Sequence, residues 1–136
     1  MKTLLFGGVR MNSAVGDLGL LILRVFSGLS LAYAHGWSKV PPDDAFVKTV
    51  TSVGFPAEMA YLTMLTEFFG GLALAAGLLT RPVALAMVIN FAVAGFMAHA
   101  ADPYVRKELP FLFLAVSTMF LCTGGGRASV DYLLKK

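Results

Sequence analysis

The sequence predicts an all-α protein built as a bundle of four transmembrane helices, and its composition and apolar runs support this. The 136 residues are 57% hydrophobic and 14% charged, with a mean hydropathy of +0.75. Ordinary globular domains are about 45–50% apolar and about 25% charged, and a domain this small cannot bury such an excess. The apolar residues form four runs, each near the roughly 20 residues that cross a bilayer. The runs lack the alternation of membrane-barrel strands.

The four runs predict helices at about residues 18–38, 57–79, 82–101 and 108–123. Residues 1–16 are expected to be a cytoplasmic or interfacial lead-in, followed by a membrane domain over 17–136. The polar stretch after the first run contains prolines and has room for a short helix. Thr80–Pro82 is predicted to be a tight turn, with the proline at the first position of the third helix. The glycines at 124–126 are expected to end the fourth helix.

Lysine and arginine in the connections predict the orientation of this bundle. One side would carry six of them, namely Lys2, Arg10, Arg81, Arg127, Lys135 and Lys136. The other side would carry four, namely Lys39, Lys48, Arg106 and Lys107. Because cytoplasmic connections carry the excess of positive charge, both termini are predicted to be cytoplasmic.

Charge and cysteine content exclude two classes of function. The net charge is only +3, and the basic residues are scattered, which argues against nucleic-acid binding. Cys122 is the single cysteine, so the chain can form neither an internal disulfide nor a CxxC dithiol.

Three polar side chains are predicted at one depth inside the bundle. At 1.5 Å per residue, Arg24 and Asn90 lie roughly 10–12 Å from the ends of the first and third helices. Glu67 in the second helix falls in the same layer, which predicts an Arg24–Glu67 pair supported by Asn90. Two interpretations stay open: a salt bridge that only locks the bundle, or a polar site for a headgroup or a proton.

A second polar layer is predicted near the outer membrane face. His35 and Lys39 share one face of the first helix with Arg24. His99 and Glu108 fall at a similar height on the third and fourth helices, so these residues could surround the mouth of a pocket. They could equally be wet interfacial groups. Two histidines could ligate haem, but no second pair or attachment motif supports that. No metal site is predicted, since only Glu108 could join them.

These residues and their spacing resemble the DoxX family of small four-helix membrane proteins. The resemblance runs from about Leu18 to Leu134. Its anchors are LRVFSGLSLAYAHGWSKV in the first helix, GFP before the second, and TEFFGGLALAAGLLTRPVAL across the second and third. The ending GGGRASVDYLL is similar to the family's Gly-x-Gly-Arg-x-Ser-x-Asp signature. The positions that match the family are Arg24, Gly28, His35, Lys39, Glu67, Gly71, Arg81, Gly126, Arg127, Ser129 and Asp131.

The resemblance implies a protein of a bacterial-type cytoplasmic membrane that takes part in redox chemistry. Members of the family are subunits of a thiosulfate:quinone oxidoreductase, or membrane partners of enzymes that handle thiols and superoxide. Related redox-associated proteins often carry paired cysteines. This chain has only Cys122, which argues against a dithiol mechanism within it.

Composition, buried charges and resemblance together predict the membrane subunit of a quinone-linked redox system. Arg24, Glu67 and His35 are the candidate catalytic residues, and Lys39, Asn90, His99 and Glu108 are the candidate substrate-binding residues. A quinone is the candidate substrate, and no resident cofactor is assigned. Expected partners are the lipid bilayer, a redox protein and further copies of the chain. The alternatives are a non-catalytic membrane anchor or assembly partner, and a carrier of protons or small molecules.

Overall fold

The computed structural model describes residues 13–135, and within that range it contains helices and connections but no strand. The α-helices are α2 (Ala14–Ser30), α3 (Asp44–Ser52), α4 (Met59–Met64), α5 (Gly70–Ala76), α6 (Thr80–Val93), α7 (Tyr104–Thr123) and α8 (Val130–Leu134). Three π-helical turns, Leu31–Gly36, Leu65–Phe69 and Ala94–Ala98, extend or join these helices. The turn at Leu31–Gly36 continues into a 3₁₀ turn, Trp37–Lys39.

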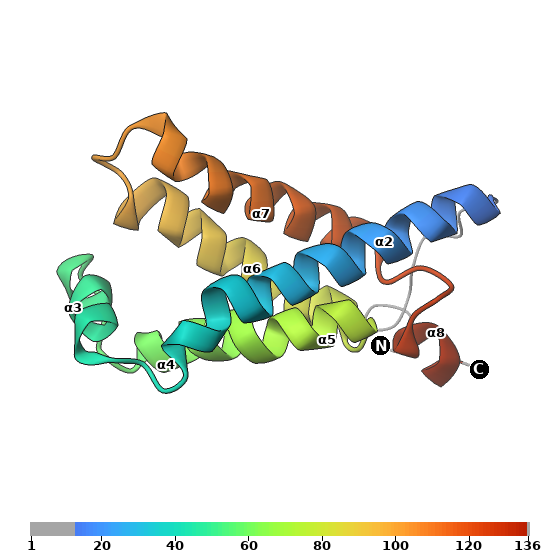
Figure 1. The fold of residues 1–136 in the computed structure, drawn as a ribbon, viewed down its shortest axis with the longest axis horizontal. Coiled ribbons are helices and arrows are strands. Elements are labelled where there is room, and N and C mark those ends of the chain that lie inside the picture. The colour runs from blue at the N-terminus through green and yellow to red at the C-terminus, as the bar shows by residue number, and fades with distance from the viewer. Residues whose placement is uncertain (1–12, 136) are drawn as a thin grey trace.

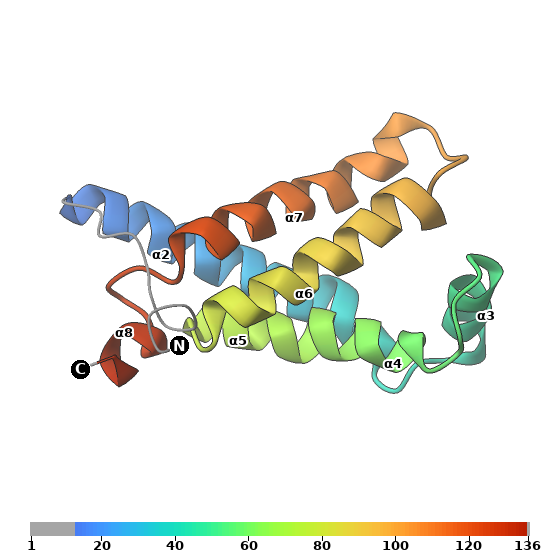
Figure 2. The ribbon, with the colours of Figure 1, turned by 180° about the vertical axis from the view of Figure 1, so that it is seen from behind.

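The helices run back and forth in four antiparallel passes (Figures 1 and 2). The passes are α2 with its following turns, α4 through α5, α6 with its π-helical turn, and α7. Short helix α3 lies at one end of the bundle and α8 at the other. We call these the α3 end and the α8 end.

Three of the four passes are long and apolar enough to cross a membrane: Ala14–Lys39, Met59–Ala76 and Thr80–Ala98. Helix α7 is 20 residues long, but Arg106, Lys107 and Glu108 occupy its beginning. The predicted all-helical fold is therefore confirmed over residues 13–135, with three helices that suit a membrane crossing.

Helix ends follow local capping chemistry, and this moves them from their expected places. Ser13 accepts a hydrogen bond from the Gly16 amide and begins α2 at residue 14. The expected lead-in over residues 1–16 thus overlaps a helix, and its residues 1–12 lie outside the described range. Gly77, at a φ of 71°, ends the second pass. Pro82 is the third residue of α6 rather than the first, a position where its missing N–H is still harmless.

Close contact between backbones determines how α2 lies against the second pass. A Cβ atom on Gly28 would lie 2.6 Å from the Gly71 carbonyl oxygen, and one on Gly36 would lie 2.6 Å from the Phe68 amide nitrogen. Small residues at such contacts let membrane helices approach closely. These glycines therefore hold the two passes in one antiparallel register.

The core runs from the middle of the bundle toward its α8 end. It is made of buried apolar side chains from all four passes: Leu20, Leu31, Leu74, Ala84, Met87, Phe91 and Phe120. Helix α7 packs along α6 as a second antiparallel hairpin (Figure 2).

Candidate functional site

The predicted Arg24–Glu67 pair is wrong, because Glu67 binds Lys39 and Asn90, whereas Arg24 binds the Ala128 carbonyl nearer the α8 end. The glycine contacts place Arg24 beside Gly77, since a Cβ on Gly77 would overlap the Arg24 guanidinium. Glu67 instead lies beside Gly36. From Glu67 to Gly77 the second pass rises roughly 15 Å. The sequence estimate began the first helix near residue 18 and ended the second near residue 79. In the structure α2 begins at Ala14 and the second pass ends at Ala76. Arg24 therefore lies level with the end of the second pass.

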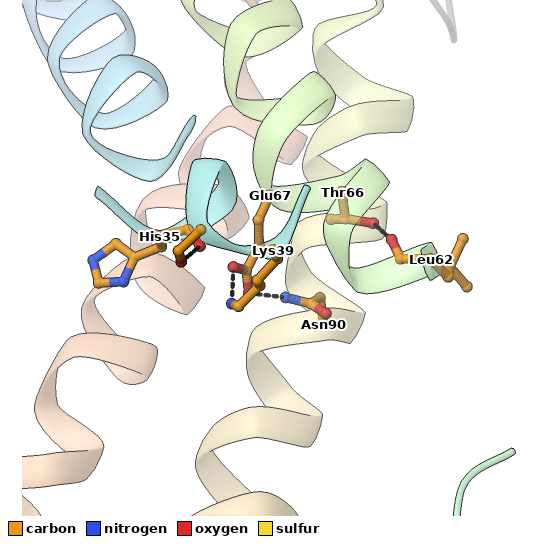
Figure 3. Close-up of polar contacts among 7 residues, drawn as sticks. His35, Lys39, Leu62, Thr66, Glu67 and Asn90 are labelled. Atoms are coloured by element: carbon orange, nitrogen blue, oxygen red, sulfur yellow. Dashed lines mark hydrogen bonds and ion pairs between the residues drawn. The ribbon is translucent and has the colours of Figure 1, made fainter. Parts of the chain in front are cut away.

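Glu67 has two partners, and both were candidate substrate-binding residues. Glu67 is only 5% exposed. Oε2 contacts the Nζ atom of Lys39, and Oε1 accepts a hydrogen bond from Asn90 Nδ2 at 3.1 Å (Figure 3). Three different passes thus meet at one carboxylate. We call Lys39, Glu67 and Asn90 the carboxylate cluster.

The carboxylate cluster forms part of the wall of a cavity of about 610 Å³. Most of the lining is apolar and comes from α3, α4, the second half of α6 and the first half of α7. His35 and His99 also line it, as does Arg106, which the sequence reasoning had not selected. A mostly apolar pocket with a few convergent polar groups is the usual form of a small-molecule site.

The two histidines line this cavity with different partners. The His35 ring points away from the carboxylate cluster (Figure 3) and packs edge-on against Phe113 of α7, with ring centroids 5.9 Å apart. His99 Nδ1 lies 2.7 Å from Asp102 Oδ2. This hydrogen bond is the main reason that the pKa of Asp102, which lies between the third and fourth passes, is below its usual value.

Glu108 does not join this site. It is exposed on the first turns of α7 and is absent from the cavity lining. The prediction that it shares the pocket mouth is therefore wrong, because α7 begins at Tyr104 and its helical phase turns Arg106 and Leu109 toward the cavity instead. Within residues 13–135, no group of three or more His, Cys, Asp or Glu side chains could hold a metal ion.

The three π-helical turns carry or adjoin the polar residues of the cavity. His35 lies in the first, Glu67 in the second, and His99 follows the third. An inserted residue rotates the following side chains around the helix, and such turns occur often at functional sites. Apolar periodicity in the sequence could not reveal them, since almost every position in these runs is apolar.

A second polar cluster joins α2 to the C-terminal segment at the α8 end. Arg24 is 1% exposed, and its Nη2 donates to the Ala128 carbonyl at 2.5 Å. Asp131 is the carboxylate whose charge acts on Arg24. Asp131 also accepts hydrogen bonds from the amides of Leu79 and Thr80, at 2.7 and 2.8 Å. We call Arg24 and Asp131, with the backbone that they bind, the terminal lock.

The terminal lock explains part of the C-terminal signature in physical terms. Asp131 supplies the cap that the start of α6 needs, and Ser129 caps α8 through the Tyr132 amide. Asp131 was not among the candidate site residues. Its match to the family signature could have identified it, because α8 alone does not explain a carboxylate at this position.

Comparison with known proteins agrees with this architecture. The model of the DoxX family matches residues 19–100. The chain is 33% identical over 124 residues to the inner membrane protein YqjF of Escherichia coli (strain K12), which covers 88% of this chain and 95% of that relative. It is 28% identical over 116 residues to a protein of Bacillus subtilis (strain 168) named "Putative oxidoreductase CatD", covering 85% of this chain and 86% of that relative. No solved structure matches the chain. The chain belongs to the DoxX family of membrane proteins.

Proposed function

We propose that this protein is the membrane subunit of a quinone-linked redox system, and that the cavity binds the quinone ring. One observation carries the proposal: the carboxylate of the buried residue Glu67 joins Lys39 and Asn90 on the wall of a mostly apolar cavity. Ionisable groups inside a membrane protein are costly and are functional candidates for that reason. The name of the relative CatD as an oxidoreductase supports the same reaction class.

The cavity suits a quinone in both shape and polarity. A quinone has an apolar ring and two carbonyl oxygens, which accept hydrogen bonds. Lys39 Nζ and Asn90 Nδ2 are donors already held at the cavity wall by Glu67, so they need little ordering to bind a carbonyl. The apolar lining from α3, α4, α6 and α7 would pack against the ring.

Reduction of a quinone to a quinol consumes two electrons and two protons, and the residues of this chain would handle the protons. Glu67 would accept a hydrogen bond from the quinol hydroxyl, and His35 on the cavity wall would pass on protons, because an imidazole ring can both donate and accept them. The electrons would come from a reduced sulfur compound of the thiol or thiosulfate class, delivered by a partner protein. Arg24 lies in the terminal lock, so we assign it no contact with the quinone.

We also propose that α7 is a fourth membrane crossing and that both termini are cytoplasmic, in a bacterial inner membrane. Helix α7 runs antiparallel along α6, and the charged residues at its start could lie at the membrane surface. The distribution of lysine and arginine favours this orientation, and the relative YqjF is called an inner membrane protein. Redox partners and self-association belong to the same proposal.

Quinone binding to the purified protein tests the proposed function. Trp37 is the single tryptophan. It does not line the cavity but lies in the chain between His35 and Lys39, which do, so saturable quenching of its fluorescence by a short-chain ubiquinone reports binding nearby. Glu67→Gln should weaken binding roughly 10- to 100-fold, the equivalent of about 1.5–3 kcal/mol for a charged hydrogen bond. Glu108→Gln makes the same chemical change outside the cavity and should leave binding unchanged.

The same preparation separates this function from the alternatives. Quinol formation with a thiol or thiosulfate donor and a co-purified partner would support an enzyme subunit. Non-saturable quenching that is equal in the wild type and Glu67→Gln would contradict the proposal. In that case, recovery of a stable partner complex would favour a membrane anchor.

A further inference from the structure

The buried charged groups of the described residues are divided between the two ends of the bundle. Glu67, with Lys39, lies toward the α3 end, and Arg24, with Asp131, lies at the α8 end. Roughly 15 Å of the second pass separates Glu67 from the level of Arg24. What fills that distance decides whether the cavity communicates with one side of the membrane or with both.

An apolar layer fills the distance between Glu67 and the level of Arg24. Leu31, Leu74 and Met87 come from three passes, and each is at most 2% exposed. Between α2 and α5 the backbones of Gly28 and Gly71 are in direct contact, which leaves no room there even for a methyl group. Close packing of this kind leaves few voids that could hold a water molecule.

The hydroxyl groups near this layer do not connect the two ends. Ser27 donates to the Leu23 carbonyl and Thr66 to the Leu62 carbonyl, each within its own helix. Figure 3 shows the Thr66 side chain turned toward Leu62 and away from Glu67. Ser117 of α7 is the remaining buried hydroxyl in this region, and one hydroxyl cannot span the distance, because each hydrogen bond covers only about 3 Å.

The cavity itself ends at the apolar layer. On α6 its lining runs from Ala86 toward the α3 end, and on α7 it runs no deeper than Phe113. At the other extreme the lining includes Thr49 of α3 and Arg106, which are both exposed. Among the residues described, Ala86 lies level with Met87 of the apolar layer, and every other lining position lies on the α3 side of the layer.

We infer that the cavity exchanges protons and water-soluble ligands with one side of the membrane only, the side of the α3 end. Water reaches Glu67 and His35 from that side alone, and the chain by itself carries no proton from one face to the other. This speaks against a carrier formed by a single copy. If the proposed quinone chemistry holds, on which this consequence rests, both protons that convert quinone to quinol are taken up at the α3 end.

Cysteine accessibility in oriented membrane vesicles tests the inference without any quinone. In a Cys122→Ser background, Ala94→Cys places a thiol on the cavity wall outside the carboxylate cluster. Lys48→Cys and Lys135→Cys place exposed thiols at the α3 end and the α8 end as reference positions. A membrane-impermeant charged maleimide is added from one side, and the thiols that remain are then labelled after detergent is added. Thr63→Cys, also on the cavity wall, serves as a second variant if Ala94→Cys fails to fold.

Ala94→Cys should lose its later labelling whenever the reagent is applied from the side that blocks Lys48→Cys. It should keep full labelling when the reagent is applied from the side that blocks Lys135→Cys. If the maleimide blocks Ala94→Cys from the α8 side, or blocks it from neither side, the inference is overturned. Because the measurement contains no quinone, its failure is distinct from failure of the proposed function, which the fluorescence titration reports.

Discussion

Lys39 and Glu67 meet across the first hairpin at the point where Gly36 lies directly against the backbone of Phe68. The ammonium group also lies 4.9 Å from the ring centroid of Phe46 on α3. One lysine thus connects the end of the first pass, the buried carboxylate and the short helix beside the cavity. Its charge is neutralised by Glu67 where the cavity wall is otherwise mostly apolar.

Removing one member of this pair should destabilise the protein more than removing both. Glu67→Leu leaves a lysine that is only 21% exposed without its partner, and we expect a loss of about 3 kcal/mol, the low end for a broken buried pair. Lys39→Met combined with Glu67→Leu should recover much of that loss. Thermal unfolding in detergent measures both. Lys39→Met alone completes the comparison. If the stability losses of Lys39→Met and Glu67→Leu simply add in the double variant, the two charges are not coupled.

Gly36→Ala should displace the second pass and weaken the carboxylate cluster. Its new methyl group would lie 2.6 Å from backbone atoms of Phe68, which cannot move without the π-helical turn that carries Glu67. We expect a loss of about 1–3 kcal/mol, typical of overpacking, measured as a lowered midpoint of thermal unfolding.

Gly19→Ala is the matched control for that experiment. It lies in α2, and a Cβ there has no atom within 4 Å. Because alanine is the better helix former, this variant should be neutral or more stable by about 0.5–1 kcal/mol. Equal destabilisation by both substitutions would contradict the close-contact explanation.

Asp131→Ala should loosen the α8 end. The substitution removes the two hydrogen bonds to the start of α6 and the charge opposite Arg24. Loss of a cap costs about 1 kcal/mol, and the buried guanidinium left without its carboxylate adds to this. Hydrogen exchange of the Leu79 and Thr80 amides should accelerate.

The cavity supplies the control for that variant. Quinone binding measured through Trp37 should be unaffected by Asp131→Ala, since the terminal lock lies on the far side of the apolar layer. A loss of binding as large as that caused by Glu67→Gln would show that the two polar clusters are coupled.

His99→Phe should raise the pKa of Asp102. The hydrogen bond from the His99 ring is the main cause of the lowered pKa, and the charge of Arg106 is a smaller one, so Arg106→Gln should raise it less. A lowered pKa in the folded protein means that this contact stabilises the fold at pH values above the usual pKa of an aspartate. The stabilisation is lost as the pH falls through the pKa of the folded protein. A carbon-detected NMR titration of the carboxyl group measures the shift. No change in His99→Phe would contradict the role of the hydrogen bond.

The sequence by itself determined the class of this protein and the residues worth examining. Long apolar runs without the alternation of barrel strands form helices in a membrane, because a helix satisfies each backbone polar group within its own segment. That is why three of the four predicted helices lie close to the three helices that are long and apolar enough to cross a membrane. Lys39, His35, Asn90 and His99 could also be selected from sequence, since a polar side chain in such a run is rare and costly.

Only the tertiary structure decided which of these residues are partners. Depth counted from expected helix ends paired Arg24 with Glu67, whereas the contact of Gly28 with Gly71 sets a register that pairs Glu67 with Lys39 and places Arg24 beside Gly77. A small shift in a helix end changes the estimated depth by several ångströms, and a π-helical turn rotates every side chain that follows it. Both effects depend on contacts between segments far apart in the chain, so local sequence patterns do not contain them.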